Sequence, residues 1–221
     1  VDASPLEASA GAALALAEES ARRGAPLTLV NLGGGMGVDY SGAGAEFPLE
    51  AHAARLAARV RGVRAEWVFE PGRWMTAPIG VLLAEVLWVK RRRGGGSGSP
   101  RRFVVLGAGM NDLIRPALYH AAHRIVPVVP RPGAEESACV VGPVCESADV
   151  FAADGKPPPL EAGDLVAILD AGAYGAAMSS NYNGRGRLAE LVVAGGRLTR
   201  ARAAESPRDL AARRTDDALD P

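Results

Sequence analysis

Cys145 and Glu146 place a thiol beside a carboxylate, soon after the apolar run 138–141. That run predicts a short strand, and Gly142 and Pro143 end it because proline has no N–H for the next rung of a ladder. Loops at strand ends commonly carry binding and catalytic side chains. The pair is therefore a candidate site, and the alternative is a buried structural thiol followed by a surface glutamate.

Glycines and charged side chains also follow two other predicted strands. A glycine triplet at 33–35 follows the apolar run 27–32, and its backbone N–H groups could hold an anion such as phosphate. Glu70 and Arg73 follow the run 67–69 at the same end of the predicted sheet. The carboxylate could face a ring nitrogen or a cation, and the arginine could grip a carboxylate. The alternatives are a plain tight turn and an exposed turn with an ion pair.

Arg115 and Tyr119 stand four residues apart, so one turn of helix would point both side chains the same way. They would form a second anion grip, although Pro116 permits only the start of a helix there. The alternative is a solvated arginine and a packing tyrosine. Tyr174 lies among small residues at 171–175, after the predicted strand 165–169, which leaves its hydroxyl accessible.

The elements that must position these residues change in kind near Pro78. Before it, helices at 5–23 and 49–60 accompany the strands 27–32 and 67–69, a strand–helix–strand unit typical of parallel sheets. A full α/β barrel needs about 250 residues, so the sequence looks like the C-terminal portion of a longer chain. We expect residues 1–77 to be the last part of such a barrel.

After Pro78 the pattern is mainly β, and we expect residues 78–204 to form a largely antiparallel barrel or sandwich. The predicted strands span 81–90, 103–106, 138–141, 165–169, 189–193 and 197–203. Gly195 and Gly196 predict a hairpin turn between the last two strands. Residues 91–102 predict a mobile polar turn, and 112–122 a helical turn. The tail, 205–221, would hold one short helix.

The length, composition and charge of the chain argue against several classes of protein and of binding partner. The chain has 221 residues, of which 48% are hydrophobic, and 25 basic residues balance 25 acidic ones. This balance gives no indication of nucleic acid or an anionic membrane as partner. No apolar run approaches the ~20 residues of a membrane span, and no signal peptide is evident. The two cysteines form no zinc pattern, so we expect no metal and interpret them as reduced thiols of a cytoplasmic protein.

Five motifs, in this order and spanning nearly the whole chain, resemble diaminopimelate decarboxylase, the pyridoxal-phosphate enzyme of the last step of lysine biosynthesis. They are Asn31-Leu32-Gly33-Gly34-Gly35, Glu70-Pro71-Gly72-Arg73, Gly109-Met110-Asn111-Asp112-Leu113-Ile114-Arg115-Pro116, Gly142-Pro143-Val144-Cys145-Glu146-Ser147 and Asp170-Ala171-Gly172-Ala173-Tyr174-Gly175. The resemblance implies a (β/α)8 barrel followed by a β domain. It also implies a carboxy-lyase that converts meso-2,6-diaminopimelate to L-lysine and CO2.

The resemblance assigns one group of residues to the cofactor, pyridoxal 5'-phosphate. The cofactor phosphate would be held by backbone at four glycines, Gly33, Gly34, Gly35 and Gly72. Glu70 would act in catalysis, because a carboxylate facing the ring nitrogen keeps that nitrogen protonated. Tyr174 would lie against the cofactor.

A second group would hold the substrate. Arg73, Arg115 and Tyr119 would bind the carboxylate that is retained. Cys145 would donate a proton near the reacting carbon, and Glu146 would bind the distal ammonium. The resemblance places these last two residues in the site of the other subunit of an obligate head-to-tail homodimer.

The family's cofactor lysine lies in an early barrel strand, and neither lysine of this chain, Lys90 or Lys156, sits in a matching motif. We therefore expect the chain alone to lack decarboxylase activity and to be poorly soluble, since barrel strands without partners expose apolar faces and sheet edges. Two alternatives stay open. One is a decarboxylase of another diamino acid, ornithine or arginine. The other is a non-catalytic dimerisation or regulatory homologue.

Overall fold

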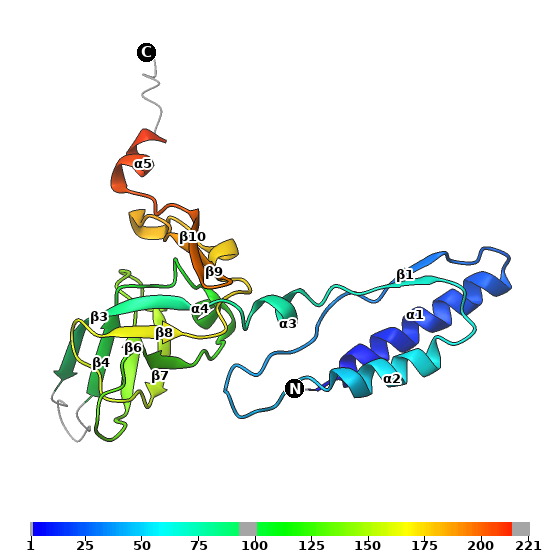
Figure 1. Ribbon diagram of the computed structural model, residues 1–221, viewed down its shortest axis with the longest axis horizontal. Helices are drawn as coiled ribbons and strands as arrows, with labels where there is room; N and C mark the ends of the chain where they lie inside the picture. Colours follow the sequence, from blue (N-terminus) through cyan, green and yellow to red (C-terminus); the bar gives the residue numbers. More distant parts are fainter. Residues whose placement is uncertain (1, 93–100, 214–221) are drawn as a thin grey trace, which may run out of the picture. The chain divides into compact units, whose positions relative to one another are not determined.

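The computed structural model describes residues 2–92 and 101–213 (Figure 1). The chain forms two compact units, Val1–Gly80 and Val81–Pro221. Most of the polar turn predicted at 91–102 lies outside the described residues, as does the end of the tail from 214. None of the described helices is long and apolar enough to cross a membrane.

The first unit contains a strand–helix–strand arrangement, as predicted. Strand β1 (Leu29–Asn31) pairs in parallel with β2 (Glu66–Val68), and helix α2 (Leu49–Arg59) connects them. Helix α1 (Ser4–Arg22) begins with a proline in its first turn, where the missing N–H costs no hydrogen bond. The short helix α3 (Gly72–Thr76) follows β2.

A small core in the first unit gathers Ala3, Met36 and Phe47. Trp74, on α3, packs against this cluster. The indole therefore serves to attach the segment after Glu70 to the rest of the unit, which accounts for so large a side chain next to Arg73.

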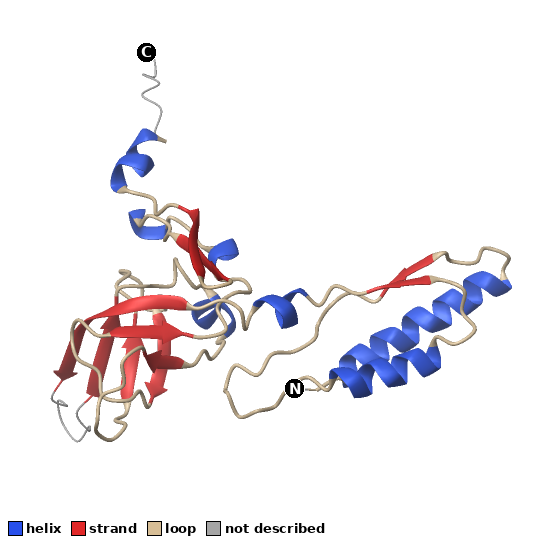
Figure 2. Cartoon of the chain, viewed as in Figure 1, coloured by secondary structure: helices blue, strands red, loops and turns tan. Residues whose placement is uncertain are grey.

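The second unit is built on a six-stranded sheet in the order β5-β8-β3-β4-β6-β7. Figure 2 draws its strands in red. Neighbouring strands in this sheet run antiparallel, except for β4 and β6, which run parallel to each other. The strands are β3 (Leu82–Arg92), β4 (Arg101–Leu106), β5 (Ile125–Pro127), β6 (Ala138–Val141), β7 (Val150–Gly155) and β8 (Leu165–Ile168). The mainly β, mostly antiparallel prediction is confirmed.

One face of this sheet forms the core. Its fully buried aliphatic side chains come from β3, β4, β6 and β8 and from the loop after β4: Val86, Val104, Leu106, Leu113, Val140, Val166 and Ile168. Along β3, Ala84 and Val86 are buried while Leu83 and Leu87 are exposed, because successive side chains of a strand point to opposite faces. The site loops described below leave the ends of β4, β6 and β8.

A hairpin and a short helix follow the sheet. Strand β9 (Glu190–Ala194) pairs with β10 (Arg197–Arg202), and Gly195 and Gly196 both have positive φ, as a two-residue type I′ turn requires. Two 3-10 helices, Ala176–Met178 and Tyr182–Gly184, lie between β8 and β9. The predicted tail helix is α5 (Pro207–Ala212).

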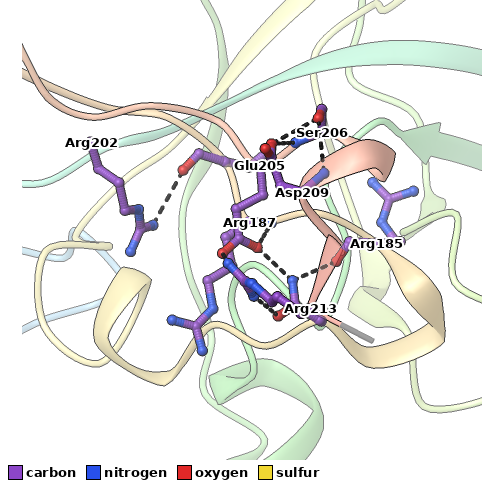
Figure 3. A network of polar contacts seen from close by, with 9 residues as sticks. Arg185, Arg187, Arg202, Glu205, Ser206, Asp209 and Arg213 are labelled. Carbon is purple, nitrogen blue, oxygen red and sulfur yellow. Dashed lines mark hydrogen bonds and ion pairs between the residues drawn. The ribbon is translucent and has the colours of Figure 1, made fainter. Parts of the chain in front are cut away.

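Glu205 ties helix α5 to the loops before the hairpin (Figure 3). Its carboxylate accepts hydrogen bonds from Asn181 Nδ2 at 2.6 Å, the Arg187 backbone N–H at 2.9 Å and Arg213 Nη2 at 2.5 Å. Ser206 then begins α5 with a reciprocal capping box to Asp209. The network fixes the start of the tail on the second unit.

These contacts, led by the Arg187 N–H, lower the pKa of Glu205 from 4.5 to about 2. A carboxyl with a lowered pKa stabilises the folded state above its unfolded pKa, and that contribution is lost as pH falls through the folded value. We therefore expect Glu205→Gln to remove a part of the acid sensitivity that lies between pH 4.5 and about 2. Urea unfolding followed by circular dichroism across this range measures it. The matched control is Glu135→Gln at an exposed position, and equal curves for the two variants would refute the assignment.

Candidate functional site

The first unit brings the glycine triplet and Glu70 together through Asn31. Asn31 Nδ2 donates to Glu70 Oε1 at 2.5 Å, and Asn31 Oδ1 accepts from the Gly33 N–H at 2.7 Å. The Glu70 N–H donates in turn to Gly33 O at 2.8 Å. Asn31 ends β1, so the parallel pairing of β1 with β2 places these two loops at one edge of the sheet. Asn31 thus orients the Glu70 carboxylate, a role that the sequence did not reveal.

The triplet needs glycine for two reasons. Gly33 and Gly35 have φ of +67° and +97°, a left-handed conformation that other residues adopt at a cost. A Cβ at Gly34 would lie 2.2 Å from Glu70 O. Among the described residues, no hydrogen-bond acceptor takes the N–H of Gly34 or Gly35. The triplet therefore brings two backbone segments close together and leaves two amides available to an anion. This arrangement fits a phosphate group.

Gly72 and Arg73 begin helix α3 directly after Glu70. The Gly72 N–H donates to Glu70 O at 2.8 Å, and the space where a Gly72 side chain would stand is open. Arg73 is half-buried and Glu70 is exposed within this chain. The turn therefore presents a carboxylate and a guanidinium within four residues of each other.

In the second unit, Arg115 is held at the start of helix α4 (Arg115–Tyr119). Its side chain is buried, with Nη1 3.2 Å from His123 Nε2 and Cζ 5.9 Å from the centre of the Tyr174 ring. The interpretation of Arg115 as a solvated surface residue is therefore wrong. Pro116 lies in the first turn, as predicted, and Tyr119 at the other end of α4 is exposed.

Tyr174 lies in the loop after β8 with a φ of +58°, and about half of its surface is exposed. Gly175 follows it because a Cβ there would meet Ala171 O at 2.3 Å. The loop therefore folds back tightly on itself and presents the phenol ring towards the Arg115 guanidinium. The two residues come from sequence positions 59 apart, and their contact joins two of the predicted site motifs.

His123 orients Arg115 as a neutral imidazole. Its Nδ1 is 2.9 Å from Leu169 O, which can only accept, so Nδ1 carries the proton and Nε2 accepts from Arg115. Burial, with repulsion from Arg115, lowers the pKa of His123 below its ordinary 6.5. No sequence pattern connects His123 with the site, because its orientation depends on Leu169, which follows the end of β8.

A base with a lowered pKa destabilises the fold as pH falls below its unfolded pKa, because the unfolded chain binds the proton more readily. We expect the free energy of unfolding to decrease from pH 6.5 downwards, and His123→Gln to remove that part of the decrease. Urea unfolding at a series of pH values tests it. His120→Asn is the control, since His120 is exposed and its left-handed conformation suits asparagine. An identical pH dependence in wild type and His123→Gln would show that His123 is not the group responsible.

Cys145 and Glu146 lie on the loop between β6 and β7, and β6 ends at Val141 as predicted. Cys145 is exposed, so its interpretation as a buried structural thiol is wrong, whereas Cys139 in β6 is buried. Tyr182 donates its hydroxyl to Glu146 Oε2 at 3.2 Å, and this bond raises the pKa of Tyr182. The loop therefore presents a free thiol beside a carboxylate held by a phenol.

Residues 29–172 match the sequence model of the pyridoxal-dependent decarboxylase C-terminal sheet domain. The chain is 41% identical over 219 residues to the diaminopimelate decarboxylase of Archaeoglobus fulgidus, covering 95% of this chain and 50% of that protein. A crystal structure of diaminopimelate decarboxylase from Helicobacter pylori, complexed with L-lysine, is similar with a TM-score of 0.82 at 37% identity. It covers 93% of this chain and 49% of that one.

The structure of the M. jannaschii diaminopimelate decarboxylase in co-complex with L-lysine is also similar, with a TM-score of 0.86 at 31% identity. It covers 100% of this chain and 50% of that one. The chain thus spans about half the length of the curated relatives it matches.

Proposed function

We propose that this chain supplies the C-terminal half of an enzyme that converts meso-2,6-diaminopimelate to L-lysine and CO2. The premise is that the chain belongs to the pyridoxal-dependent decarboxylase family. The observation that carries the proposal is the similarity to diaminopimelate decarboxylases over 95% of the chain. Charged groups suited to both ends of a diamino dicarboxylic acid support it.

The first unit would serve the cofactor. Pyridoxal phosphate, when bound, supplies a ring that takes up the electron pair left by the departing carboxyl group. Glu70, oriented by Asn31, would keep the proton on the ring nitrogen, because a nearby carboxylate favours the charged form of its neighbour. The Gly34 and Gly35 amides would bind the phosphate, and the open space beside Gly72 suits the approach of an anion.

The substrate would be held at its two ends. Arg115, Arg73 and Tyr119 would bind the carboxylate that is retained, with Arg115 fixed in advance by His123 and Tyr174. Such an arrangement costs little reorganisation when the carboxylate arrives. Tyr174 would also lie against the cofactor ring.

At the distal end, Glu146 would bind the substrate ammonium, with its carboxylate oriented by Tyr182. Cys145 would then deliver a proton from Sγ to the reacting carbon. In the proposed homodimer, both residues serve the site of the partner copy. A thiol and a carboxylate on an exposed loop suit that arrangement better than a site within one chain.

The test is turnover by the full-length gene product with added pyridoxal phosphate. We expect CO2 and L-lysine from meso-diaminopimelate, and much slower turnover of ornithine and arginine, which lack the second carboxylate and would leave an arginine unpaired. Faster turnover of ornithine or arginine would replace the proposed substrate. No turnover of any of the three would favour a non-catalytic homologue.

A further inference from the structure

Two loops of the second unit carry the candidate substrate-binding side chains. Residues 107–114 connect β4 to α4 and lead into Arg115, and residues 142–149 connect β6 to β7 and carry Cys145 and Glu146. Strands β4 and β6 are parallel neighbours, so the two loops leave the same edge of the sheet. Beyond the ends of these strands, the relative position of the two loops depends on the contacts between them.

Asp149 joins them. Its side chain is 3% exposed, and each carboxylate oxygen accepts one backbone N–H from a different loop. Met110 N lies 2.7 Å from Oδ1, and Val144 N lies 2.7 Å from Oδ2. The Asp149 backbone also closes its own loop, because Gly142 N–H donates to Asp149 O at 3.0 Å.

Both loops have a glycine beside the Asp149 side chain: Gly142 in its own loop and Gly109 in the other. A Cβ on Gly142 would lie 2.3 Å from Asp149 Oδ2 and 2.5 Å from Oδ1. A Cβ on Gly109 would lie 2.8 Å from Val144 Cγ2 and 3.1 Å from Asp149 Oδ2. Real Cβ atoms essentially never come within 3.0 Å of another heavy atom, so Gly142 keeps the space that the Asp149 side chain fills, and Gly109 keeps the space beside Val144.

The 107–114 loop is also fixed on its other side. Asp112 Oδ2 accepts from Gly109 N–H at 3.0 Å, and Arg185 donates to Asn111 Oδ1 at 3.1 Å and to Gly107 O at 2.7 Å. Asn111 itself is 1% exposed. The loop is therefore held at several points, and the bond to Met110 adds a contact to the segment that leads into α4.

We propose that Asp149 is a positioning residue, which holds the loop leading to Arg115 and the loop carrying Cys145 and Glu146 in fixed register. Its consequence for catalysis rests on the proposed function, whereas the hydrogen bonds do not. If the two loops serve different sites of a dimer, Asp149 links the carboxylate grip of one site to the proton donor of the other.

Asp149→Asn tests the bonds. Both oxygens accept an N–H, so an amide of the same shape keeps one bond and turns its NH2 towards the other donor. We expect hydrogen exchange in the full-length gene product to become roughly tenfold faster in peptides covering 107–114 or 142–149. Peptides covering Val104 and Val140 should keep their protection. The matched control, Asp154→Asn on the exposed part of β7, should change neither loop.

Kinetics test the positioning role. We expect kcat/KM of Asp149→Asn to fall roughly 10- to 100-fold, with kcat lowered through Cys145 and KM raised through Arg115. Loss of folded protein would lower the apparent kcat and leave KM unchanged. Unchanged exchange, or faster exchange with unchanged kcat and KM, would overturn the inference. An inactive wild-type protein would refute the proposed function. The hydrogen-exchange measurement would still decide whether Asp149 holds both loops.

Gly142→Ala provides a second variant that keeps every charge. Its methyl group displaces the Asp149 carboxylate, so we expect the same two loops to exchange faster and kcat/KM to fall. Gly107→Ala is its control, because the nearest atom to a Cβ there is Glu85 O at 3.6 Å, an ordinary contact. Equal effects of the two alanine substitutions would also contradict the role given to Asp149.

Discussion

Cys145→Ser should lower kcat of the full-length gene product by about 10²- to 10⁴-fold, the usual contribution of a positioned general acid. Cys145 is exposed, and a serine hydroxyl in its place is nearly the same size but a far weaker acid than a thiol. KM should change little, because a proton donor acts in the transition state rather than in binding. Steady-state release of CO2 from meso-diaminopimelate measures both constants.

Cys139→Ala is the matched control for the thiol. Cys139 lies in β6 and is buried, so its replacement should cost some stability and leave kcat unchanged. A Cys145→Ser protein with kcat within twofold of wild type would remove Cys145 from the proton transfer. The carbon would then receive its proton from another group.

Arg115→Ala should act mainly through binding. Removing one partner of a desolvated charge pair costs about 2–5 kcal/mol, so kcat/KM should fall by roughly 30- to 4,000-fold. Most of the loss should appear as a higher KM, because the proposed contact with the retained carboxylate would hold in ground state and transition state alike. Arg115→Lys should recover only part of it, since an ammonium cannot give a two-pronged bond or stack on Tyr174 in the same way.

Arg124→Ala is the control for Arg115. Arg124 is half-exposed and lies 3.3 Å from Asp170, so it belongs to the same unit without being buried at the candidate site. Its removal should change kcat/KM by less than about threefold, because the Arg124 side chain reaches solvent and only its partner Asp170 is buried. Equal defects in the two alanine variants would indicate a general loss of folding rather than a lost substrate contact.

Much of the fold follows from local sequence patterns. The helices α1 and α2 were predicted within about one residue of their ends because their apolar stripes stop at glycine, proline or charged turns. Strand β6 begins and ends where the apolar run does. The hairpin β9–β10 follows from two adjacent glycines that accept positive φ.

Two strands escaped prediction for a physical reason. β5 has three residues and ends in proline, and β7 reads Val-Phe-Ala-Ala-Asp-Gly, with only two strong strand formers. Both are strands because β8 and β6 offer them an edge. The parallel pairing of β4 with β6 likewise depends on distant segments, which a local pattern does not encode.

The candidate site likewise contains residues that the sequence predicts and residues that only the fold brings to it. The motifs identified Glu70, Arg115, Cys145 and Glu146 by residue type, and their catalytic roles stay predictions. The side chains that orient them were missed: Asn31 for Glu70, His123 for Arg115 and Tyr182 for Glu146. Each is an ordinary polar residue whose partner is 8 to 39 residues away in sequence, so only the fold brings the pair together.

Mixed dimers of the full-length gene product test the central claim, that Arg115 and Cys145 of one chain act in different copies of the active site. In a hybrid of Arg115→Ala and Cys145→Ser chains, one site would carry both substitutions and the other neither. Random reassociation of equal amounts should therefore restore about a quarter of the wild-type rate of CO2 release, measured at substrate well below KM, where both parents are far slower. If both residues act in the same copy, every hybrid site carries one substitution. Activity would then stay at the level of the parents, and that result would contradict the account.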